Sequence, residues 1–467
     1  MAFYLAIDLG TTGCRSILFD DSLEIVSSSY EEYGLITLRE GWVEQDAELW
    51  WSLTVKTSKK AICDAKVSPS EVKGISISSQ GITIVPVDKN FSAIYNAISW
   101  LDLRAEKETL QIDSDFGETE IFEHTGKSVN AAYTLPKLLW IKENLPEIWS
   151  SAEKFLMPMD FLLAKLTGKC VTDHSMASGT LLYDIEKRCW SKRLLDHYEI
   201  DENKLPEIRW SGECVGKVLP SVAQELGVSE DCVVAVGAQD QKCAALGAGL
   251  RNGTMTISLG TAAAVTKLWT EVNTKENKSV GWCGYTEQGT WVTEGVVSTA
   301  GTCLRWVRDM MFRGEEYSVI DDEAMQAKLR GSSLLFYPYL GEDACFYGAS
   351  LATERGDFAL AVMQGVAFEI RKLLEKMEAD KGIDRLVMFG GGAKGDLWCQ
   401  MISDITQKEL VVPTTAEAAG AGAAMLAARA AGSELAPLAA AKKFTPQENC
   451  DEKYEKYISL ERKIWER

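Results

Sequence analysis

The chain has 467 residues, of which 46% are hydrophobic and 25% are charged, and this composition is typical of a globular protein with about two or three domains. The formal net charge of −19 argues against a protein whose partner is the phosphate backbone of a nucleic acid, because such a partner requires clustered Lys and Arg. It does not exclude a nucleotide site, since backbone N–H groups and a metal ion can hold a single nucleotide.

The cysteines and the N-terminus indicate a cellular compartment. The 12 cysteines stand singly, without a C-x-x-C pair and without clustering around the three histidines. This pattern argues against zinc and is typical of free thiols in a reducing compartment, so we expect a cytoplasmic protein. The N-terminus runs directly into a predicted strand and no window approaches 18 uninterrupted apolar residues, so we expect neither export nor a membrane partner.

The first predicted element is a β-hairpin. Residues 3–9 and 15–20 have the pattern of strands, and Gly10-Thr11-Thr12-Gly13 turns the chain between them. A helix is predicted over 46–65, and a strand over 72–78.

A second strand–turn–strand passage is predicted over 254–267. Its residues 257–261, ISLGT, repeat IDLGT of 7–11, although such segments share composition and the repeat can be a coincidence. The segment 231–253 lies between the two hairpins and is the natural domain junction. We therefore expect one domain over 1–245 and another over 246–467.

The C-terminal part continues the alternation of strands and helices. A strand over 385–389 leads through glycines to a helix that begins near Asp396, and the Ala-rich run 416–431 is predicted as a packed helix in which Gly420 and Gly422 allow close approach. The alternation predicts an α/β fold with layered sheets.

Asp8 and the two hairpin turns are candidates for binding phosphate and a metal ion. Asp8 ends an apolar strand, and the small residues after it leave backbone N–H groups able to face an anion. A carboxylate beside phosphates suits Mg²⁺. The second turn, Gly260-Thr261-Ala262, offers the same donors without an acid. Taken singly, each segment is also compatible with a plain turn.

A third glycine-rich turn is a candidate for nucleotide binding. It comprises residues 390–396, GGGAKGD, between a strand and a helix, where glycines permit a ligand to approach the backbone. It lacks the Walker A spacing, and a glycine-rich turn of this kind also serves packing alone.

Asp240 is the candidate catalytic base. It follows an apolar strand over 232–236 and precedes a helix of small residues, with Gln239 and Gln241 beside it. A carboxylate within reach of an acceptor hydroxyl can orient it and accept its proton during phosphoryl transfer. The alternative is an N-cap Asp.

The pattern Trp100-x-Asp102-x-Arg104 is a candidate for sugar binding. An extended segment would present all three side chains on one side, where Asp and Arg can bond hydroxyls while Trp covers an apolar face. A salt bridge is the alternative. A hydrolase triad has little support, because only three histidines are available and no G-x-S-x-G motif occurs.

Nearly end to end, the chain resembles the FGGY carbohydrate kinases, the family of xylulokinase, glycerol kinase and gluconokinase. The segments that carry the resemblance, in matching order, are 6–20 (AIDLGTTGCRSILFD), 41–51 (GWVEQDAELWW), 78–88 (SSQGITIVPVD), 100–105 (WLDLRA), 136–149 (PKLLWIKENLPEIW), 161–185 (FLLAKLTGKCVTDHSMASGTLLYDI), 237–249 (GAQDQKCAALGAG), 258–264 (SLGTAAA) and 390–407 (GGGAKGDLWCQMISDITQ).

The resemblance implies an α/β fold of two actin-like (ribonuclease H-like) domains that enclose a deep interdomain cleft. It implies ATP and Mg²⁺ as cofactors and a small sugar or polyol as the partner that is phosphorylated. Family members are often dimers or tetramers, so a homodimer is compatible with the resemblance, and no sequence pattern identifies an interface.

The resemblance also assigns roles to single positions. Asp240 is implied as the catalytic base, and Asp8 and Asp240 as the residues near the metal. The implied acceptor-binding residues are Gln80, Gly81, Ile82, Trp100, Asp102, Arg104, Tyr133, Asp240 and Gln241. The implied ATP-binding residues are Gly10, Thr11, Thr12, Arg15, Gly260, Thr261, Gly301, Arg305, Gly391, Gly392, Ala393 and Asp396. Arg305 stands where glycerol kinase has Gln, so its contact is an open point.

The acceptor segment departs from both relatives. After Gln80, glycerol kinase has Arg-Glu and xylulokinase has Met-His, whereas this chain has Gly81-Ile82. Two non-ionic residues leave room for a neutral acceptor, and a ketopentose such as xylulose is the leading expectation. Another pentulose, a tetrulose, glycerol or another polyol, and an aldonate are the alternatives.

Proteins of other classes are also considered. An actin-like ATPase or nucleotide-gated binding protein would share Asp8 and both turns. A catalytically silent regulatory relative is disfavoured because the acidic residues and glycines are present.

Overall fold

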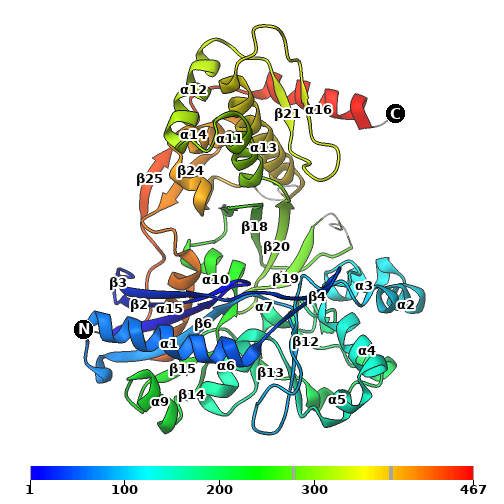
Figure 1. Cartoon of the computed structure of the whole chain (residues 1–467), viewed down its shortest axis with the longest axis vertical. Coiled ribbons are helices and arrows are strands. Elements are labelled where there is room, and N and C mark those ends of the chain that lie inside the picture. Colours follow the sequence, from blue (N-terminus) through cyan, green and yellow to red (C-terminus); the bar gives the residue numbers. More distant parts are fainter. Residues whose placement is uncertain (1, 276–277, 279, 378–381, 466–467) are drawn as a thin grey trace. The chain divides into compact units, whose positions relative to one another are not determined.

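The computed structural model describes residues 2–275, 278, 280–377 and 382–465 (Figure 1). The chain divides into two units, and the first contains residues 1–247, 269–292 and 417–438. The second contains 248–268, 293–416 and 439–467. Two late segments thus pack with the first unit, while the expected domain ranges 1–245 and 246–467 remain a prediction.

The first unit is built on a sheet with the strand order β14-β15-β6-β1-β2-β3, in which β16 also pairs with β6. The N-terminal hairpin predicted from the sequence is confirmed, because β1 and β2 pair antiparallel, with Asp8 opposite Arg15. Strand β6 runs parallel to β1, so both end at the same edge of the sheet. The bounds are β1 Phe3–Leu9, β2 Gly13–Asp20, β3 Ile25–Glu32, β6 Val72–Ser79, β14 Cys214–Lys217, β15 Val233–Ala235 and β16 Ala238–Gln239.

Helices cover both faces of this sheet. Ser16 of β2 hydrogen-bonds to Thr57 of helix α1 (Ala47–Ala65), and its neighbour Ile17 lies beside Gly420 of helix α15 (Ala418–Ala430). Because consecutive strand residues point to opposite faces, α1 and α15 lie on opposite faces, as Figure 1 shows. The predicted helices over 46–65 and 416–431 are confirmed, and Asp46 caps α1 by accepting from two backbone N–H groups.

Helices α10 (Asp240–Gly247) and α15 pack so closely that their backbones are in contact. A β-carbon added at Gly422 would lie 1.9 Å from the carbonyl oxygen of Cys243, so only glycine allows this approach. The close packing predicted for the Ala-rich helix is therefore confirmed.

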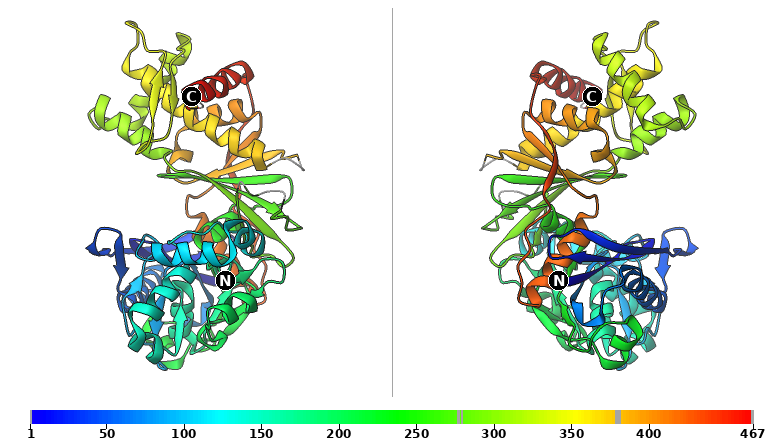
Figure 2. Two further views of the ribbon diagram at one scale, coloured as in Figure 1. Left: turned by 90° about the vertical axis from the view of Figure 1, so that its right-hand side faces the viewer. Right: turned by 90° about the vertical axis from the view of Figure 1, so that its left-hand side faces the viewer.

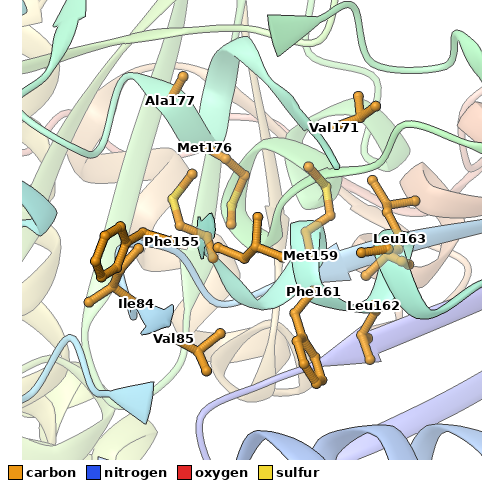
Figure 3. Packing of buried hydrophobic residues seen from close by; sticks show 14 of the residues in the cluster. Ile84, Val85, Phe155, Met159, Phe161, Leu162, Leu163, Val171, Met176 and Ala177 are labelled. Atoms are coloured by element: carbon orange, nitrogen blue, oxygen red, sulfur yellow. The ribbon is translucent and has the colours of Figure 1, made fainter. Parts of the chain in front are cut away.

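A large apolar core lies beneath the sheet of the first unit. Figure 3 shows part of it, where Phe155, Met159 and Phe161 pack with residues of the neighbouring strands and helices. The remaining elements assigned to this unit are β4 Ile36–Arg39, β5 Trp42–Gln45, β7 Val85–Val87, β8 Ala97–Ile98, α2 Glu106–Phe116, α3 Glu118–Thr125, α4 Thr134–Asn144, α5 Pro146–Ser151, β9 Lys154–Leu156, α6 Pro158–Thr167, β10 Val171–Asp173, α7 His174–Ala177, β11 Tyr183–Asp184, β12 Cys189–Trp190, α8 Lys192–His197, β13 Glu207–Arg209, α9 Pro220–Leu226 and β19 Gly281–Gly284.

The second unit has a sheet in which the strands run β20-β18-β17-β23-β24-β25. The second predicted hairpin is confirmed, because β17 and β18 pair antiparallel, and β23 runs parallel to β17. The long helix α13 packs with α11, α12 and α14, and lies above the green strands in Figure 2. The bounds are β17 Thr254–Leu259, β18 Ala263–Trp269, β20 Trp291–Val297, α11 Gly301–Met311, α12 Tyr317–Leu329, β21 Leu335–Tyr337, β22 Cys345–Tyr347, α13 Arg355–Met377, β23 Arg385–Phe389, α14 Asp396–Thr406, β24 Glu409–Pro413, β25 Ala440–Phe444 and α16 Asp451–Trp465.

Within the described part of the chain, no helix combines the length and the apolar character needed to cross a membrane.

Candidate active site

Asp8 and Asp240 lie at one edge of the first unit's sheet. Strand β6 pairs in parallel with both β1 and β16, and its residue Ser78 is opposite Asp8 on one side and Ala238 on the other. Because neighbouring strands are about 4.8 Å apart, β1 and β16 are about 10 Å apart at this level. Asp240 follows β16 directly, so the two carboxylates stand at the carboxyl ends of two parallel strands that flank β6.

Asp8 is a partly buried carboxyl group. Burial raises its pKa to about 6, against the opposing effect of the Ser78 hydroxyl, which donates to Oδ1 at 2.9 Å. The carboxylate of Glu417 raises the pKa further, and Arg15 lowers it. Asp8 is therefore mostly ionised at neutral pH and becomes protonated as the pH falls through about 6.

The hairpin turn after Asp8 is held by its neighbours. The backbone N–H of Gly10 donates to the carbonyl of Gly13 at 2.9 Å, and the Gln45 amide donates to the carbonyl of Thr11 at 2.7 Å. Thr12 is exposed. Arg15, expected at the phosphates, forms an ion pair with Glu417.

Asp240 is the first residue of α10, as the sequence predicted for a helix N-terminus. Its Oδ1 accepts from the backbone N–H of Gln241 at 2.7 Å and from the side-chain amide of Gln239. The positive end of the helix dipole favours the ionised carboxylate at this position. These contacts orient a carboxyl group that is only partly buried, so a hydroxyl group can reach it.

Sequence reasoning missed the residues that support Asp240. The Ser175 hydroxyl accepts from the backbone N–H of Gln239 at 2.9 Å and donates to Asp173 at 2.9 Å. Asp173 is fully buried and also accepts from the Ser211 hydroxyl. An Asp that ends strand β10 and caps helix α7 is the sequence signal that could have pointed to this network, but its burial and its link to Gln239 exist only in the tertiary structure.

The expected acceptor segment follows β6. Gln80 is buried, its backbone N–H donates to the carbonyl of Leu9 at 2.8 Å, and its side-chain amide donates to Gln45 at 3.0 Å. A β-carbon added at Gly81 would lie 3.2 Å from Cγ of Gln239, so this segment packs beside the residue that precedes Asp240. Gln239, the residue directly before Asp240 and Gln241, is thus brought against Gly81.

Ile82 has a backbone φ of 54°, which is rare for a β-branched residue. It is the centre of a three-residue turn in which the backbone N–H of Thr83 donates to the carbonyl of Gly81 at 2.7 Å. A turn of this kind with a positive central φ is the strained form. Tyr133, the residue before helix α4, is half-buried.

Trp100 connects the expected acceptor residues to the first hairpin turn. Its indole N–H donates to the Thr11 hydroxyl at 3.0 Å, its backbone N–H donates to Thr83 at 3.1 Å, and the residue is 37% exposed. An exposed indole at the edge that carries Asp8 is suited to cover an apolar face of a sugar.

The prediction that an extended segment presents Trp100, Asp102 and Arg104 on one side is wrong. The chain turns here, and the side chains of Asp102 and Arg104 are 0% exposed. Asp102 pairs with Arg104 at 2.8 Å, and Glu44 pairs with Arg104 at 2.9 Å, because a buried guanidinium group requires carboxylate partners. The salt bridge considered as the alternative therefore forms, and it leaves neither side chain any surface; direct sugar contact by these two residues stays an untested prediction.

The second unit contains a cavity of about 690 Å³, a volume that suits a nucleotide. It brings together six of the expected ATP-binding residues, namely Gly260, Thr261, Gly301, Arg305, Gly391 and Gly392. It is also lined by Tyr317, Ser318, Asp321 and Trp398, which sequence reasoning missed because they are dispersed along two helices.

Two expected residues lie beside the cavity rather than in its lining. Ala393 is buried in the turn that precedes α14, and Asp396 pairs with Lys442 at 2.5 Å.

The hairpin tip and the N-terminus of α11 meet at this cavity. The backbone N–H of Gly301 donates to the carbonyl of Gly260 at 3.0 Å, and that of Ala300 donates to Thr261 at 3.0 Å. A β-carbon at Gly301 would lie 2.2 Å from the Gly260 oxygen, so the approach requires glycine. The positive end of an 11-residue helix thus stands at the cavity wall, where it favours an anion.

Comparison with known proteins identifies the family. The model of the FGGY family of carbohydrate kinases matches with its N-terminal domain over residues 3–247 and with its C-terminal domain over 255–431. The xylulose kinase of Lactococcus lactis subsp. lactis is 32% identical over 92% of this chain and 88% of that protein. The glycerol kinase of Thermococcus gammatolerans is 30% identical over 91% of this chain and 88% of its own length.

A solved structure supports the fold. The ligand-bound xylulose kinase from Lactobacillus acidophilus aligns with a TM-score of 0.91 and 23% sequence identity, covering 99% of this chain and 98% of that one. The fold and the matches define a sugar kinase of the actin-like class, a phosphotransferase with an alcohol group as acceptor. The chain belongs to the FGGY family of carbohydrate kinases, which confirms the predicted family and the predicted actin-like α/β fold.

Proposed function

We propose that this protein transfers the γ-phosphate of ATP to a hydroxyl group of a ketopentose, with xylulose as the leading acceptor. The observation that carries the proposal is the oriented carboxylate of Asp240 at the strand edge that also holds Asp8. The relatives named xylulose kinase from Lactococcus lactis and Bacillus subtilis, at 32% and 31% identity, support this acceptor.

Asp240 is the proposed base. The acceptor hydroxyl donates to its carboxylate, which turns an oxygen lone pair toward the γ-phosphorus. As the new O–P bond forms, the bond from phosphorus to the β,γ-bridging oxygen breaks, the proton passes to Asp240, and ADP leaves. The two N–H donors on Oδ1 limit rotation of the carboxylate, so its orientation is set before the substrate arrives.

The proposed nucleotide site is the cavity of the second unit. The N-terminus of α11, which lies against the turn at Gly260, supplies the positive end of its helix dipole for phosphate oxygens. Gly391, where an added β-carbon would meet no atom within 4 Å, leaves an open wall for the adenosine part, and the exposed phenol ring of Tyr317 offers apolar contact. The turn of Gly10 to Thr12 is proposed to bind phosphate in the same way.

The residues present fit a Mg²⁺ ion held mainly by its substrate. Among the described residues, no group of three or more His, Cys, Asp and Glu side chains is arranged to hold a metal. A single carboxylate such as Asp8, together with phosphate oxygens and water, is the coordination that Mg²⁺ commonly adopts. When bound, the ion would neutralise negative charge on the phosphates, and Asp8 would hold it directly or through water, with Asp240 nearby.

The acceptor segment supports a neutral sugar. Gly81 and Ile82 carry no ionisable group, and Trp100 offers an exposed aromatic face. These features favour a ketose over an aldonate, whose carboxylate requires a cationic partner. We also propose that the reaction takes place in the cytoplasm, where ATP is available and single cysteines stay reduced.

The proposal is tested by ADP release from purified protein with a panel of acceptors. The panel contains D- and L-xylulose, the ribuloses, rhamnulose, erythrulose, erythritol, glycerol and gluconate, with a reaction lacking acceptor as the background. We expect the highest kcat/KM with a ketopentose. A higher kcat/KM for glycerol or gluconate would identify that compound, and not a ketopentose, as the acceptor. ADP release that no acceptor increases would favour an actin-like ATPase instead.

Asp240→Asn tests the base. We expect kcat to fall by roughly 10²–10⁴-fold while ATP binding is retained, because the amide cannot accept the proton. Asp231→Asn, in an exposed ion pair with Lys217, is the matched control and should leave kcat unchanged. Retention of more than about a tenth of the turnover by Asp240→Asn would refute the assignment.

A further inference from the structure

Lys137 is an unusual residue in the first unit, because its side chain is fully buried. It lies in helix α4, and its Nζ donates to the carbonyl oxygen of Ala132 at 2.5 Å and to that of Ile82 at 3.5 Å. Burial lowers its pKa to about 7, with Asp102 opposing the shift and Arg104 adding to it. A buried amine is costly unless its hydrogen bonds are satisfied, and these two carbonyl groups satisfy them. The presence of a lysine at this enclosed position requires an explanation.

The two carbonyl groups belong to two different loops of the expected acceptor site. Ile82 follows Gln80 and Gly81, and Ala132 directly precedes Tyr133. A second donor acts on the same carbonyl, since the Thr134 hydroxyl lies 3.4 Å from the Ile82 oxygen. Helix α4 therefore presents two donors to one carbonyl oxygen of the acceptor segment.

Ile82, whose carbonyl oxygen accepts from Lys137 and Thr134, also has a strained backbone. Ile82 has a φ of 54°, and its side chain is wedged against Gly179, where an added β-carbon would lie 2.6 Å from Cγ2 of Ile82. A strained backbone persists only where its surroundings hold it, and such strain concentrates at functional sites. Lys137 and Thr134 are the groups that hold the carbonyl of this turn.

We propose that Lys137 is a positioning residue for the acceptor site, which holds the strained turn at Ile82 and the loop before Tyr133 in one fixed arrangement. This inference rests on the proposed function. Lys137 does not contact the sugar, because its side chain is completely enclosed and its Nζ points to backbone oxygens. The two loops that it joins would contact the acceptor, so its effect reaches the sugar through their placement.

The test is a kinetic comparison of Lys137→Met with Lys142→Met. Lys142 lies on the same helix and also donates to two carbonyl groups, those of Tyr198 and Glu199, which are not in the expected acceptor segments. For Lys137→Met we expect the acceptor KM to rise by about tenfold and the ATP KM to stay within about twofold. Lys142→Met should change neither KM. A loss of thermal stability without this KM split would overturn the inference.

A double-mutant cycle tests the route through Ile82. Ile82→Gly removes the cost of a positive φ, so the turn no longer needs to be held. We therefore expect Lys137→Met to raise the acceptor KM by a smaller factor in the Ile82→Gly background than in the wild type. Equal factors in the two backgrounds would contradict positioning through this turn.

Further measurements keep the inference testable if Lys137→Met does not fold. Thr134→Val removes the other donor to Ile82 while leaving Lys137 in place, and it should raise the acceptor KM by about threefold without changing the ATP KM. Acceptor binding measured by calorimetry without ATP should weaken in the same proportion. An unchanged acceptor affinity in Thr134→Val would refute the inference. If the wild type phosphorylates no acceptor, the proposed function itself fails, and the two failures are thereby distinguished.

Discussion

Gly422→Ala is expected to destabilise the first unit and to disturb catalysis, because Gly422 allows helices α10 and α15 to touch. An added β-carbon would lie 1.9 Å from the carbonyl oxygen of Cys243, and the reciprocal position, Gly247, would lie 2.1 Å from that of Ala418. Both obstacles are backbone atoms, which cannot rotate away as a flexible side chain can. The helices must therefore separate by about 1.5 Å to reach an ordinary van der Waals distance.

The expected cost follows from this displacement. Overpacking in a well-packed core costs about 1–3 kcal/mol, and the better helix propensity of Ala offsets at most about 1 kcal/mol. A net loss of about 1–2 kcal/mol corresponds to a fall in Tm of about 2–8 °C for a domain of this size. Because Asp240 begins α10, a shift of about 1 Å there is expected to lower kcat on the order of 10²-fold.

The assay is differential scanning calorimetry together with kcat at saturating substrates. Gly34→Ala is the control, since an added β-carbon there meets no atom within 4 Å, and it should change neither quantity. A Gly422→Ala variant with the Tm and kcat of the wild type would show that the two helices can separate freely and would refute the reasoning.

Three further variants test single groups. Asp8→Asn should weaken the Mg²⁺ dependence of kcat/KM and remove the wild-type loss of Mg²⁺ affinity as the pH falls through about 6, where Asp8 protonates; an unchanged pH dependence would contradict this role. Burial raises the pKa of Asp160 to about 8 from 3.8, so the folded state keeps a proton that the unfolded state releases, and the stability of the wild type should fall as the pH rises from 3.8 to about 8. Asp160→Asn should flatten this decline in Tm, and an equally steep decline would argue against a buried protonated carboxyl. Gly301→Ala should raise the ATP KM by about tenfold, measured beside the acceptor KM, because its β-carbon would lie 2.2 Å from the Gly260 oxygen; equal changes in both KM values would refute a nucleotide-specific effect.

Local elements were largely predictable from the sequence. Both hairpins, the strand over 72–78 and the helices over 46–65 and 416–431 are present. Their signals are local, because alternation, turn residues and capping residues act within a few positions of the chain. The resemblance to a family added the fold class, which periodicity alone leaves open between several layered α/β arrangements.

The local geometry at Asp240 and at the glycine turns was predictable from the sequence, whereas the contacts that support Asp240 were not. Asp240 starts a helix as expected, yet the contact that supports it joins its neighbour Gln239 to Ser175, 64 positions away. Asp102 and Arg104 were predicted to bind a sugar, but they form an enclosed ion pair that Glu44 of strand β5 completes. A pattern of residue types does not reveal which side of a turn faces the core.

The amino-acid sequence by itself determined the family, the hairpins and the residues able to carry chemistry, because these depend on short motifs of neighbouring residues and on their order along the chain. Only the tertiary structure decided that residues 269–292 and 417–438 pack with the first unit, that helix α15 packs against the helix that Asp240 begins, and that Lys137 reaches the carbonyl of Ile82. The physical reason is that burial and hydrogen bonding join groups that are distant in sequence, and their free energy depends on the complete packing around them.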